Sequence, residues 1–167
     1  MKKRVDLPEK KYEGYIFDLD GTLVDSMPLH YRAWREALAR AGAPDHVFRA
    51  DEFYSCGGKS ANDVVCFLNE RYGMHMDAAS TAADKRRIYL EMLEKEGMQP
   101  IREVVEFVHS LGDAPKAIAT GSAMPGASRT LAAAGLSGLF DVILTPDEVE
   151  HGKPAPDMFL KAAELLG

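Results

Sequence analysis

IFDLDGTLVDS, at residues 16–26, joins an apolar run to two carboxylates and a glycine. Side chains on a strand repeat with a period of two, so Asp18 and Asp20 share one side if the strand continues regularly to Asp20. Gly21 then lets the backbone turn away. Two acids at the carboxyl end of a buried strand are costly to desolvate, which favours a functional role for both. The alternative is that Asp20 and Gly21 form only a turn and that Asp18 is a surface acid.

Three short apolar runs predict buried parallel strands, because strands that are covered on both faces lack the polar alternation of half-exposed ones. These runs are residues 15–19, 117–120 and 142–144. Helical patterns precede the second and third runs and follow the third, at residues 101–108, 127–134 and 159–166. This alternation predicts a doubly wound, Rossmann-like α/β core with a parallel sheet.

A long stretch of helical patterns with no clear strand separates the first strand from the second. Pro28 punctuates its start, and residues 97–100 punctuate its end. We therefore expect residues 27–98 to form a helical insertion with a hinge at each junction. The α/β core then comprises residues 1–26 and 99–167.

The composition excludes several classes of partner. The chain has 167 residues and a formal net charge of −6, whereas nucleic-acid binding needs a basic face that releases counterions. No apolar run approaches the roughly 18 residues that a membrane span needs, so neither nucleic acid nor membrane is an expected partner. Only Cys56 and Cys66 are present, and nothing resembles a secretory signal. We therefore expect a reduced, cytoplasmic protein.

The residues DLDGTLVDS, at 18–26, resemble the first motif of the haloacid dehalogenase (HAD) superfamily, most of whose members are phosphatases and phosphomutases. The resemblance implies that Asp18 attacks phosphorus and forms an aspartyl phosphate. It also implies that Asp20 is the general acid and base, which protonates the leaving oxygen and then activates water. A carboxylate suits covalent catalysis because acyl phosphates hydrolyse readily. Within the family, residues 27–98 match the helical cap that closes over the active site.

Two later stretches resemble the second and third motifs of the same family. The first begins at Thr120, the last residue of the second predicted strand, where α/β sheets present groups to ligands. There the resemblance implies that Thr120 and Gly121 hold phosphate oxygens. The second is GKPAPD, at residues 152–157. There it implies that Lys153 neutralises Asp18 and the incoming phosphate.

Two residues of the helical insertion are candidates for contact with substrate. Lys59 lies in the cap loop that faces the active site in this family, so it is placed to touch substrate hydroxyls or phosphate; the alternative is simple exposure. His30 lies one turn into the first predicted cap helix. It resembles a histidine that some sugar-phosphate members place near the general acid, although a lone helical histidine is more often structural.

The resemblance implies a Mg²⁺-dependent phosphatase that acts on a small phosphorylated metabolite. A finer resemblance, carried by residues 27–34 and 152–160, is to the β-phosphoglucomutase-like branch with its fructose-1-phosphate phosphatases. It implies a sugar phosphate such as fructose 1-phosphate. The alternative is a phosphomutase. Mutases of this group hold a distal phosphate with a cap-loop arginine, whereas this chain has Ala61 there. Alanine cannot make bidentate phosphate contacts, so hydrolysis is favoured.

The family has a fourth motif, an acidic pair that completes its Mg²⁺ site, and no such pair follows the third motif before Gly167. The metal ligands that the resemblance leaves are Asp18 and the backbone carbonyl of Asp20, with more octahedral positions falling to water. We therefore expect a fragment. A three-stranded sheet without its neighbouring strand exposes a hydrophobic edge and favours association. A catalytically silent fragment or a dimerising module is the second alternative.

Overall fold

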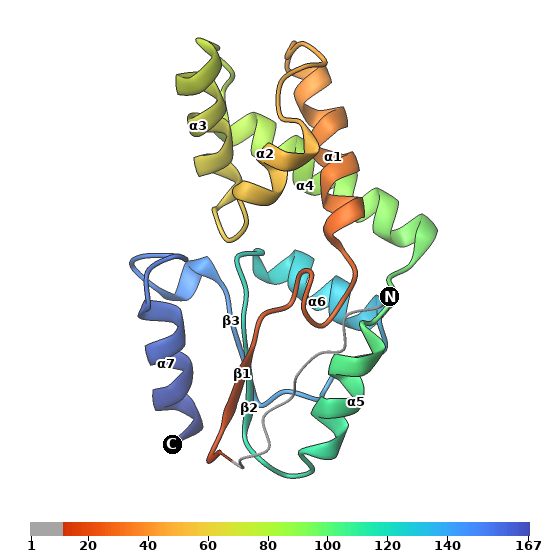
Figure 1. Cartoon of the computed structure of the whole chain (residues 1–167), viewed down its shortest axis with the longest axis vertical. Helices are drawn as coiled ribbons and strands as arrows, with labels where there is room; N and C mark the ends of the chain where they lie inside the picture. Colours follow the sequence, from red (N-terminus) through yellow and green to blue (C-terminus); the bar gives the residue numbers. More distant parts are fainter. Residues whose placement is uncertain (1–11) are drawn as a thin grey trace.

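The computed structural model describes residues 12–167, which form a sheet half and a helical half (Figure 1). The strands of the sheet half are β1 (Tyr15–Phe17), β2 (Lys116–Ala119) and β3 (Val142–Leu144). Its helices are α5 (Arg102–Ser110), α6 (Met124–Ala133) and α7 (Asp157–Leu166), with a 3₁₀ turn, η1 (Pro146–Glu148). The helical half contains α1 (Met27–Arg40), α2 (Ala50–Ser55), α3 (Ala61–Tyr72) and α4 (Ala78–Glu96).

The sheet is parallel and has the order β1-β2-β3, so β2 lies in its centre. Phe17 pairs with Ile118, and Ile118 pairs in turn with Ile143. Every residue of β2 is buried, which explains its apolar run. The α/β class with a parallel sheet is confirmed. β2 begins and ends one residue earlier than predicted, and β3 has the predicted bounds.

β1 is shorter than predicted, because it ends at Phe17 and not at Leu19. The carbonyl oxygen of Leu19 accepts hydrogen bonds from the amides of the three residues that follow Gly21, at 3.0 to 3.3 Å. Gly21 has a φ of +76° in this compact turn, a conformation that glycine adopts without strain. The regular strand assumed for Asp18 and Asp20 is therefore wrong. Both acids lie beyond the end of β1, and Asp20 directly precedes the turn.

Helices cover both faces of the sheet. Ile118 lies in one buried cluster with Val108 of α5 and Leu131 of α6. Its neighbour Ala117 faces the other way and packs in a second cluster with Met158 of α7. Figure 1 shows α5 and α7 on opposite sides of the sheet. This double cover explains why the strands lack polar alternation.

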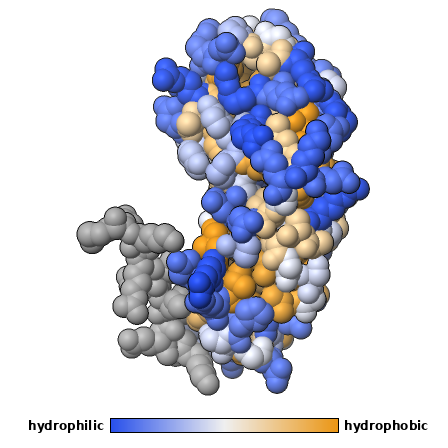
Figure 2. Space-filling view, turned by 90° about the vertical axis from the view of Figure 1, so that its right-hand side faces the viewer, coloured by the Kyte–Doolittle hydropathy of each residue, from blue (hydrophilic) through white to orange (hydrophobic). Residues whose placement is uncertain are grey.

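The surfaces of the two halves differ in hydropathy on the face shown in Figure 2. The helical half is mostly hydrophilic there, whereas hydrophobic residues gather on the sheet half. Within residues 12–167, no helix combines the length and the apolar character that crossing a membrane requires.

The helical half has a hydrophobic core of its own, in which Trp34, Phe48 and Leu68 are buried together. Two of its helices, α3 and α4, begin at side-chain caps that the sequence supplies. The Ser60 hydroxyl accepts a hydrogen bond from a backbone amide in the first turn of α3, and the Asp77 carboxylate does the same for α4. The apolar stripes of the sequence are therefore the buried faces of real helices.

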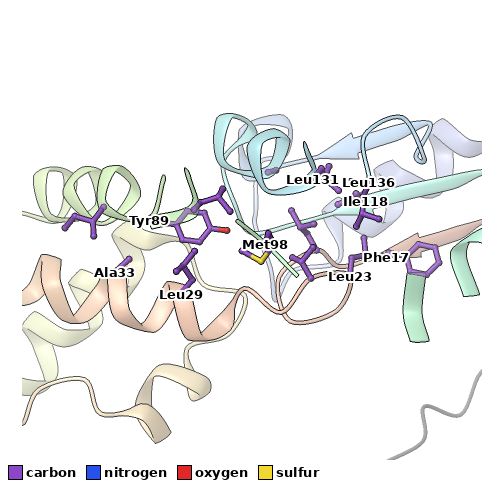
Figure 3. Close-up of a cluster of buried hydrophobic side chains, with 14 of the residues drawn as sticks. Phe17, Leu23, Leu29, Ala33, Tyr89, Met98, Ile118, Leu131 and Leu136 are labelled. Carbon is purple, nitrogen blue, oxygen red and sulfur yellow. The ribbon is translucent and has the colours of Figure 1, made fainter. Parts of the chain in front are cut away.

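Two adjacent chain segments connect the halves. Val24 forms an antiparallel bridge with Pro100, the Asp25 amide donates to Gln99 O at 2.9 Å, and the Ile101 amide donates to a carbonyl of the outgoing segment at 2.8 Å. A single buried cluster also runs across the junction, as Figure 3 shows from Ala33 and Tyr89 through Met98 to Leu23 and Phe17. The two halves therefore meet along a narrow, apolar seam.

Candidate active site

A pocket of about 580 Å³ lies between the two halves. The sheet half contributes residues from the carboxyl ends of its strands, among them Asp18, Gly121 and Lys153. The helical half contributes side chains of α1 and α4 and the loop that precedes α3. In doubly wound sheets this end is where ligands bind.

Asp18 and Lys153 form an ion pair at the floor of this pocket. Lys153 Nζ donates to Asp18 Oδ1 at 2.9 Å and to the carbonyl oxygen of Ala119, at the end of β2, at 2.8 Å. The Lys153 side chain is largely buried, whereas 41% of the Asp18 side chain is exposed. The lysine is thus fixed by two acceptors, while the second oxygen of Asp18 remains accessible to a bound molecule.

Asp20 is held much more tightly than Asp18. The Ser26 hydroxyl donates to its Oδ1 at 2.6 Å, the His30 imidazole bonds the same oxygen at 3.0 Å, and the Ser122 hydroxyl donates to Oδ2 at 2.6 Å. Only 17% of its side chain is exposed. Burial by itself would raise the pKa of Asp20, but His30 and the two serines outweigh it, and the net pKa lies well below its usual range.

His30 connects Asp20 to a buried lysine. Lys85 Nζ lies 2.8 Å from His30 Nδ1, and an ammonium group can only donate there, so Nδ1 accepts and Nε2 carries the hydrogen bound to Asp20. Burial and the Lys85 charge lower the pKa of His30, against the opposing effect of Asp20. The imidazole is therefore neutral and has one defined tautomer.

Lys85 itself lies in an aromatic enclosure. Its Nζ is 5.5 Å from the centre of the Trp34 ring and 5.4 Å from that of Tyr89. Burial lowers the pKa of Lys85 to about 8, and the charge of Asp20 opposes this shift. Cation–π contacts partly replace the water that burial removes from the ammonium.

The three residues after β2 have separate positions. Thr120 is fully buried, and its Oγ1 accepts the amide of Ser122 at 3.1 Å. Gly121 lines the pocket, and a Cβ placed on it would lie 3.4 Å from Gly58 O in the helical half. The two halves therefore lie close together at this point. The roles of Thr120 and Gly121 in phosphate binding stay predictions.

The loop of Lys59 lies directly over Lys153. A Cβ placed on Gly58, whose φ is +85°, would lie 3.5 Å from the Cβ of Lys153. The exposed Lys59 lines the pocket and has no ion-pair partner within the described part of the chain. It is positioned to meet a bound anion, and its contact with substrate stays a prediction.

Sequence reasoning missed Lys85, Tyr89 and the contact of Ser122 with Asp20. A signal for Lys85 exists, because positions 85, 88, 89 and 92 follow helical spacing on one buried stripe. A lysine in such a stripe needs a buried partner. No local pattern shows which partner it finds.

The magnesium ligands that the family resemblance implies are Asp18 and the backbone carbonyl of Asp20, and they stay predictions. Asp18 offers an accessible carboxylate oxygen, which is a ligand that Mg²⁺ prefers. The carboxylate oxygens of Asp20 accept three hydrogen bonds from protein donors. Within residues 12–167, no group of three or more acidic, histidine or cysteine side chains is arranged to hold a metal ion.

The fold and the pocket define a class of protein: a doubly wound α/β chain with charged groups at its strand ends and helices over them. The sequence model of the haloacid dehalogenase-like hydrolases matches residues 12–167, and the chain belongs to this family. It is therefore an enzyme of a hydrolase family, as the first motif predicted.

Curated relatives include phosphatases and a mutase. Fructose-1-phosphate phosphatase YqaB of Escherichia coli is 33% identical over 159 residues, which cover 95% of this chain and 82% of the relative. Hexitol phosphatase A of Escherichia coli is 35% identical over 93% of this chain and 69% of the relative. A beta-phosphoglucomutase of Mycobacterium tuberculosis is 32% identical over 96% of this chain and 71% of the relative. The phosphatase branch of the family is thereby confirmed.

Solved structures have the same fold. A hydrolase from Pseudomonas syringae superposes with a TM-score of 0.75 at 29% identity, over 92% of this chain and 69% of that one. CbbY from Rhodobacter sphaeroides, in complex with phosphate, superposes with a TM-score of 0.78 at 22% identity, over 92% of this chain and 72% of that one. The second match carries the fold alone.

Proposed function

We propose that this enzyme hydrolyses the phosphate monoester of a small sugar phosphate, such as fructose 1-phosphate, through an aspartyl phosphate on Asp18. The observation that carries the proposal is the pairing of Asp18 with Lys153 in the pocket, beside the buried Asp20. Relatives that are named as phosphatases of fructose 1-phosphate, hexitols and phosphorylated carbohydrates support this substrate class.

In the first step, the free oxygen of Asp18 attacks phosphorus. A bond forms between that oxygen and phosphorus, the bond from phosphorus to the sugar oxygen breaks, and the leaving oxygen takes a proton from Asp20. In the second step, Asp20 takes a proton from water, the water oxygen attacks phosphorus, and the bond to Asp18 breaks. Inorganic phosphate leaves, and both carboxyl groups return to their starting state.

Lys153 serves both steps by opposing the negative charge that gathers at phosphorus. Its ammonium is held by Asp18 and by a main-chain carbonyl, so it needs little reorganisation when the phosphate arrives. Gly121 presents backbone next to the same point, and Thr120 lies directly behind it. We propose these residues as the phosphate-binding group.

Asp20 must carry a proton to act as an acid, although its three donors lower its pKa. A phosphate dianion bound beside it disfavours the charged carboxylate and raises that pKa again. The proton affinity of Asp20 therefore increases when substrate is present, and Ser26, His30 and Ser122 keep the carboxyl group oriented meanwhile.

Magnesium belongs to this proposal as the ion expected for the family. Asp18 and the backbone carbonyl of Asp20 are the residues of this chain that would hold it, and the bound ion would neutralise phosphate charge. We further propose that residues 27–98 act as a cap, since they supply one whole wall of the pocket and join the sheet half through two adjacent segments.

The test is phosphate release by the purified chain from a panel of sugar phosphates, with Mg²⁺ and with excess chelator. We expect Mg²⁺-dependent release from at least one ketose, aldose or hexitol monophosphate. Release from none of them under either condition would overturn the proposal.

A phosphomutase is the second candidate, because a beta-phosphoglucomutase is among the relatives. Ala61 stands on the pocket wall at the start of α3 and offers no donor for a second phosphate, which favours hydrolysis. NMR of a β-glucose 1-phosphate reaction separates the two functions. Conversion to glucose 6-phosphate that is much faster than phosphate release would make the enzyme a mutase.

A further inference from the structure

Tyr89 of α4 touches both halves of the molecule. Its ring stacks on the His30 imidazole, with 4.0 Å between centroids and 9° between planes. Its hydroxyl makes a hydrogen bond of 2.8 Å with Oγ1 of Thr130 on α6. In Figure 3 the hydroxyl points away from Ala33, toward the sheet half. One side chain thus spans from the group that orients Asp20 to a helix of the opposite half.

The hydroxyl pair stands out because its surroundings are apolar. Tyr89 lies in the same buried cluster as Leu29 and Ile88, and Thr130 is buried on α6. A buried hydroxyl without a partner is unfavourable, so each of these two groups requires the other in the observed arrangement. A phenylalanine and a valine would fill the same space without this requirement. The pair therefore specifies how α4 lies against α6.

The tyrosine hydroxyl lies on the long axis of the rigid ring, so the hydrogen bond to Thr130 fixes the direction of that axis beside His30. The ring plane is parallel to that of His30, whose Nε2 reaches Asp20 and whose Nδ1 accepts from Lys85. If the halves separate, the bond to Thr130 breaks and the ring axis is free to tilt away from its place beside His30. The imidazole then loses the flat surface that holds it in line with Asp20.

We propose that Tyr89 is a positioning residue that makes the orientation of His30 on Asp20 depend on contact between the two halves. The hydrogen bond to Thr130 favours the closed arrangement, and the stacked ring transmits that arrangement to the imidazole. The inference rests on the proposed function, in which Asp20 transfers the proton. It adds that contact with Thr130 of α6 reaches this acid through the ring of Tyr89.

The two contacts of Tyr89 are separable by substitution. Tyr89→Phe and Thr130→Val each remove the hydrogen bond and keep the shape, whereas Tyr89→Leu removes the ring that stacks on His30. Loss of the bond lowers the closed fraction, and apparent affinity falls with the fraction that is competent to bind. Loss of the ring acts on the oriented proton donor and therefore on turnover.

The experiment measures kcat and KM for phosphate release by the full chain and its variants. We expect Tyr89→Phe and Thr130→Val each to raise KM by about 3- to 10-fold with kcat within twofold, and the double variant to match either single variant. We expect Tyr89→Leu to lower kcat by about 10-fold or more. Tyr72→Phe is the matched control, because its hydroxyl bonds Glu52 within the helical half. It should leave both constants within twofold.

A second readout does not depend on turnover. Trp34 is the single tryptophan and lies on the pocket wall, so its fluorescence reports binding of inorganic phosphate. We expect Tyr89→Phe to weaken this response by the same factor as KM. An unchanged KM and an unchanged response in Tyr89→Phe would overturn the inference, as would additive effects in the double variant. If no protein releases phosphate, the proposed function fails, and the fluorescence titration still decides the role of the hydrogen bond.

Discussion

The wall that the sheet half contributes to the pocket differs from the helical wall in how its charged groups are held. On the sheet side, Lys153 donates to a main-chain carbonyl at a strand end, and Asp18 forms an ion pair with that lysine. On the helical side, Lys85 and His30 are fixed by each other and by aromatic rings. Backbone positions one wall, and packing between helices positions the other.

The two carboxylates show what this difference does. Asp18 has one partner and a substantially exposed side chain, as a group that must reach a substrate requires. Asp20 has three donors, two of which come from residues 26 and 30 at the start of the helical half. The proposed nucleophile therefore has access, and the proposed acid has a fixed orientation. We call the sheet side of the pocket, with Asp18, its open wall and the helical side, with His30 and Lys85, its supporting wall.

The largest effect is expected on the open wall. Asp18→Asn removes the proposed nucleophile and should lower kcat by about 10⁴-fold or more, because no other group can form the covalent intermediate. Phosphate-release assays measure it. The matched control is Asp25→Asn, an exposed acid of the same segment outside this pocket, which should keep activity. Substantial turnover by Asp18→Asn would show that Asp18 is not the attacking group.

Lys153→Met tests the other half of the same ion pair. We expect kcat to fall by about 10²- to 10³-fold, the usual cost of removing one charge-stabilising donor from an active site. Lys161→Met is its control, since Lys161 donates to Glu148 O away from the pocket. If Lys153→Met retains as much activity as Lys161→Met, Lys153 does not stabilise the transition state. The proposed role of the open wall would then be wrong.

Lys85→Met tests the supporting wall through stability. The folded chain disfavours charged Lys85, whose pKa is lowered from 10.5 to about 8. Below pH 8 both the folded and the unfolded chain carry the charge, and the burial cost is complete. As the pH rises from 8 toward 10.5, the folded chain releases this proton first, so the unfolded chain binds more protons and stability increases.

The free energy of unfolding of the wild type, relative to Lys85→Met, should therefore rise across this pH range, by at most about 3 kcal/mol at about 1.4 kcal/mol per pKa unit. Urea denaturation at several pH values measures it. Lys95→Met, at an exposed position of the same helix, should show no comparable trend. A flat difference between wild type and Lys85→Met would mean that the lysine is not held as a buried charge.

The smallest effect is expected at Lys59, which lines the pocket and whose side chain has no ion-pair partner in residues 12–167. Lys59→Met should raise KM by about 3- to 10-fold with kcat unchanged, because it removes a contact made equally in ground and transition states. Steady-state kinetics on the preferred sugar phosphate measure it, with Lys95→Met as the control again. A change in kcat alone would place Lys59 among the groups that act on the reacting atoms.

Much of the open wall could be predicted, because its residues lie next to elements that local patterns reveal. Asp18 and Lys153 each follow a strand whose apolar run is visible in the sequence. The length of the first strand, β1, was less predictable. β1 ends two residues early because the Leu19 carbonyl is taken by the following turn, a competition that periodicity does not register.

The supporting wall was predictable only in part. His30 was a candidate through resemblance, but its partner Lys85 lies 55 residues further along the chain. The bond from Tyr89 to Thr130 spans 41 residues and joins opposite halves. Helical spacing shows that positions 85 and 89 face inward, and it carries no information on what they meet.

The sequence alone determined the class of fold, the approximate places of the three strands and the identity of the two carboxylates, because apolar periods and turn residues act over a few positions. The tertiary structure decided which carboxylate is open and which is enclosed. That outcome depends on how α1 and α4 pack over the sheet, since a pKa, a tautomer and a ring orientation are set by groups that meet only after folding.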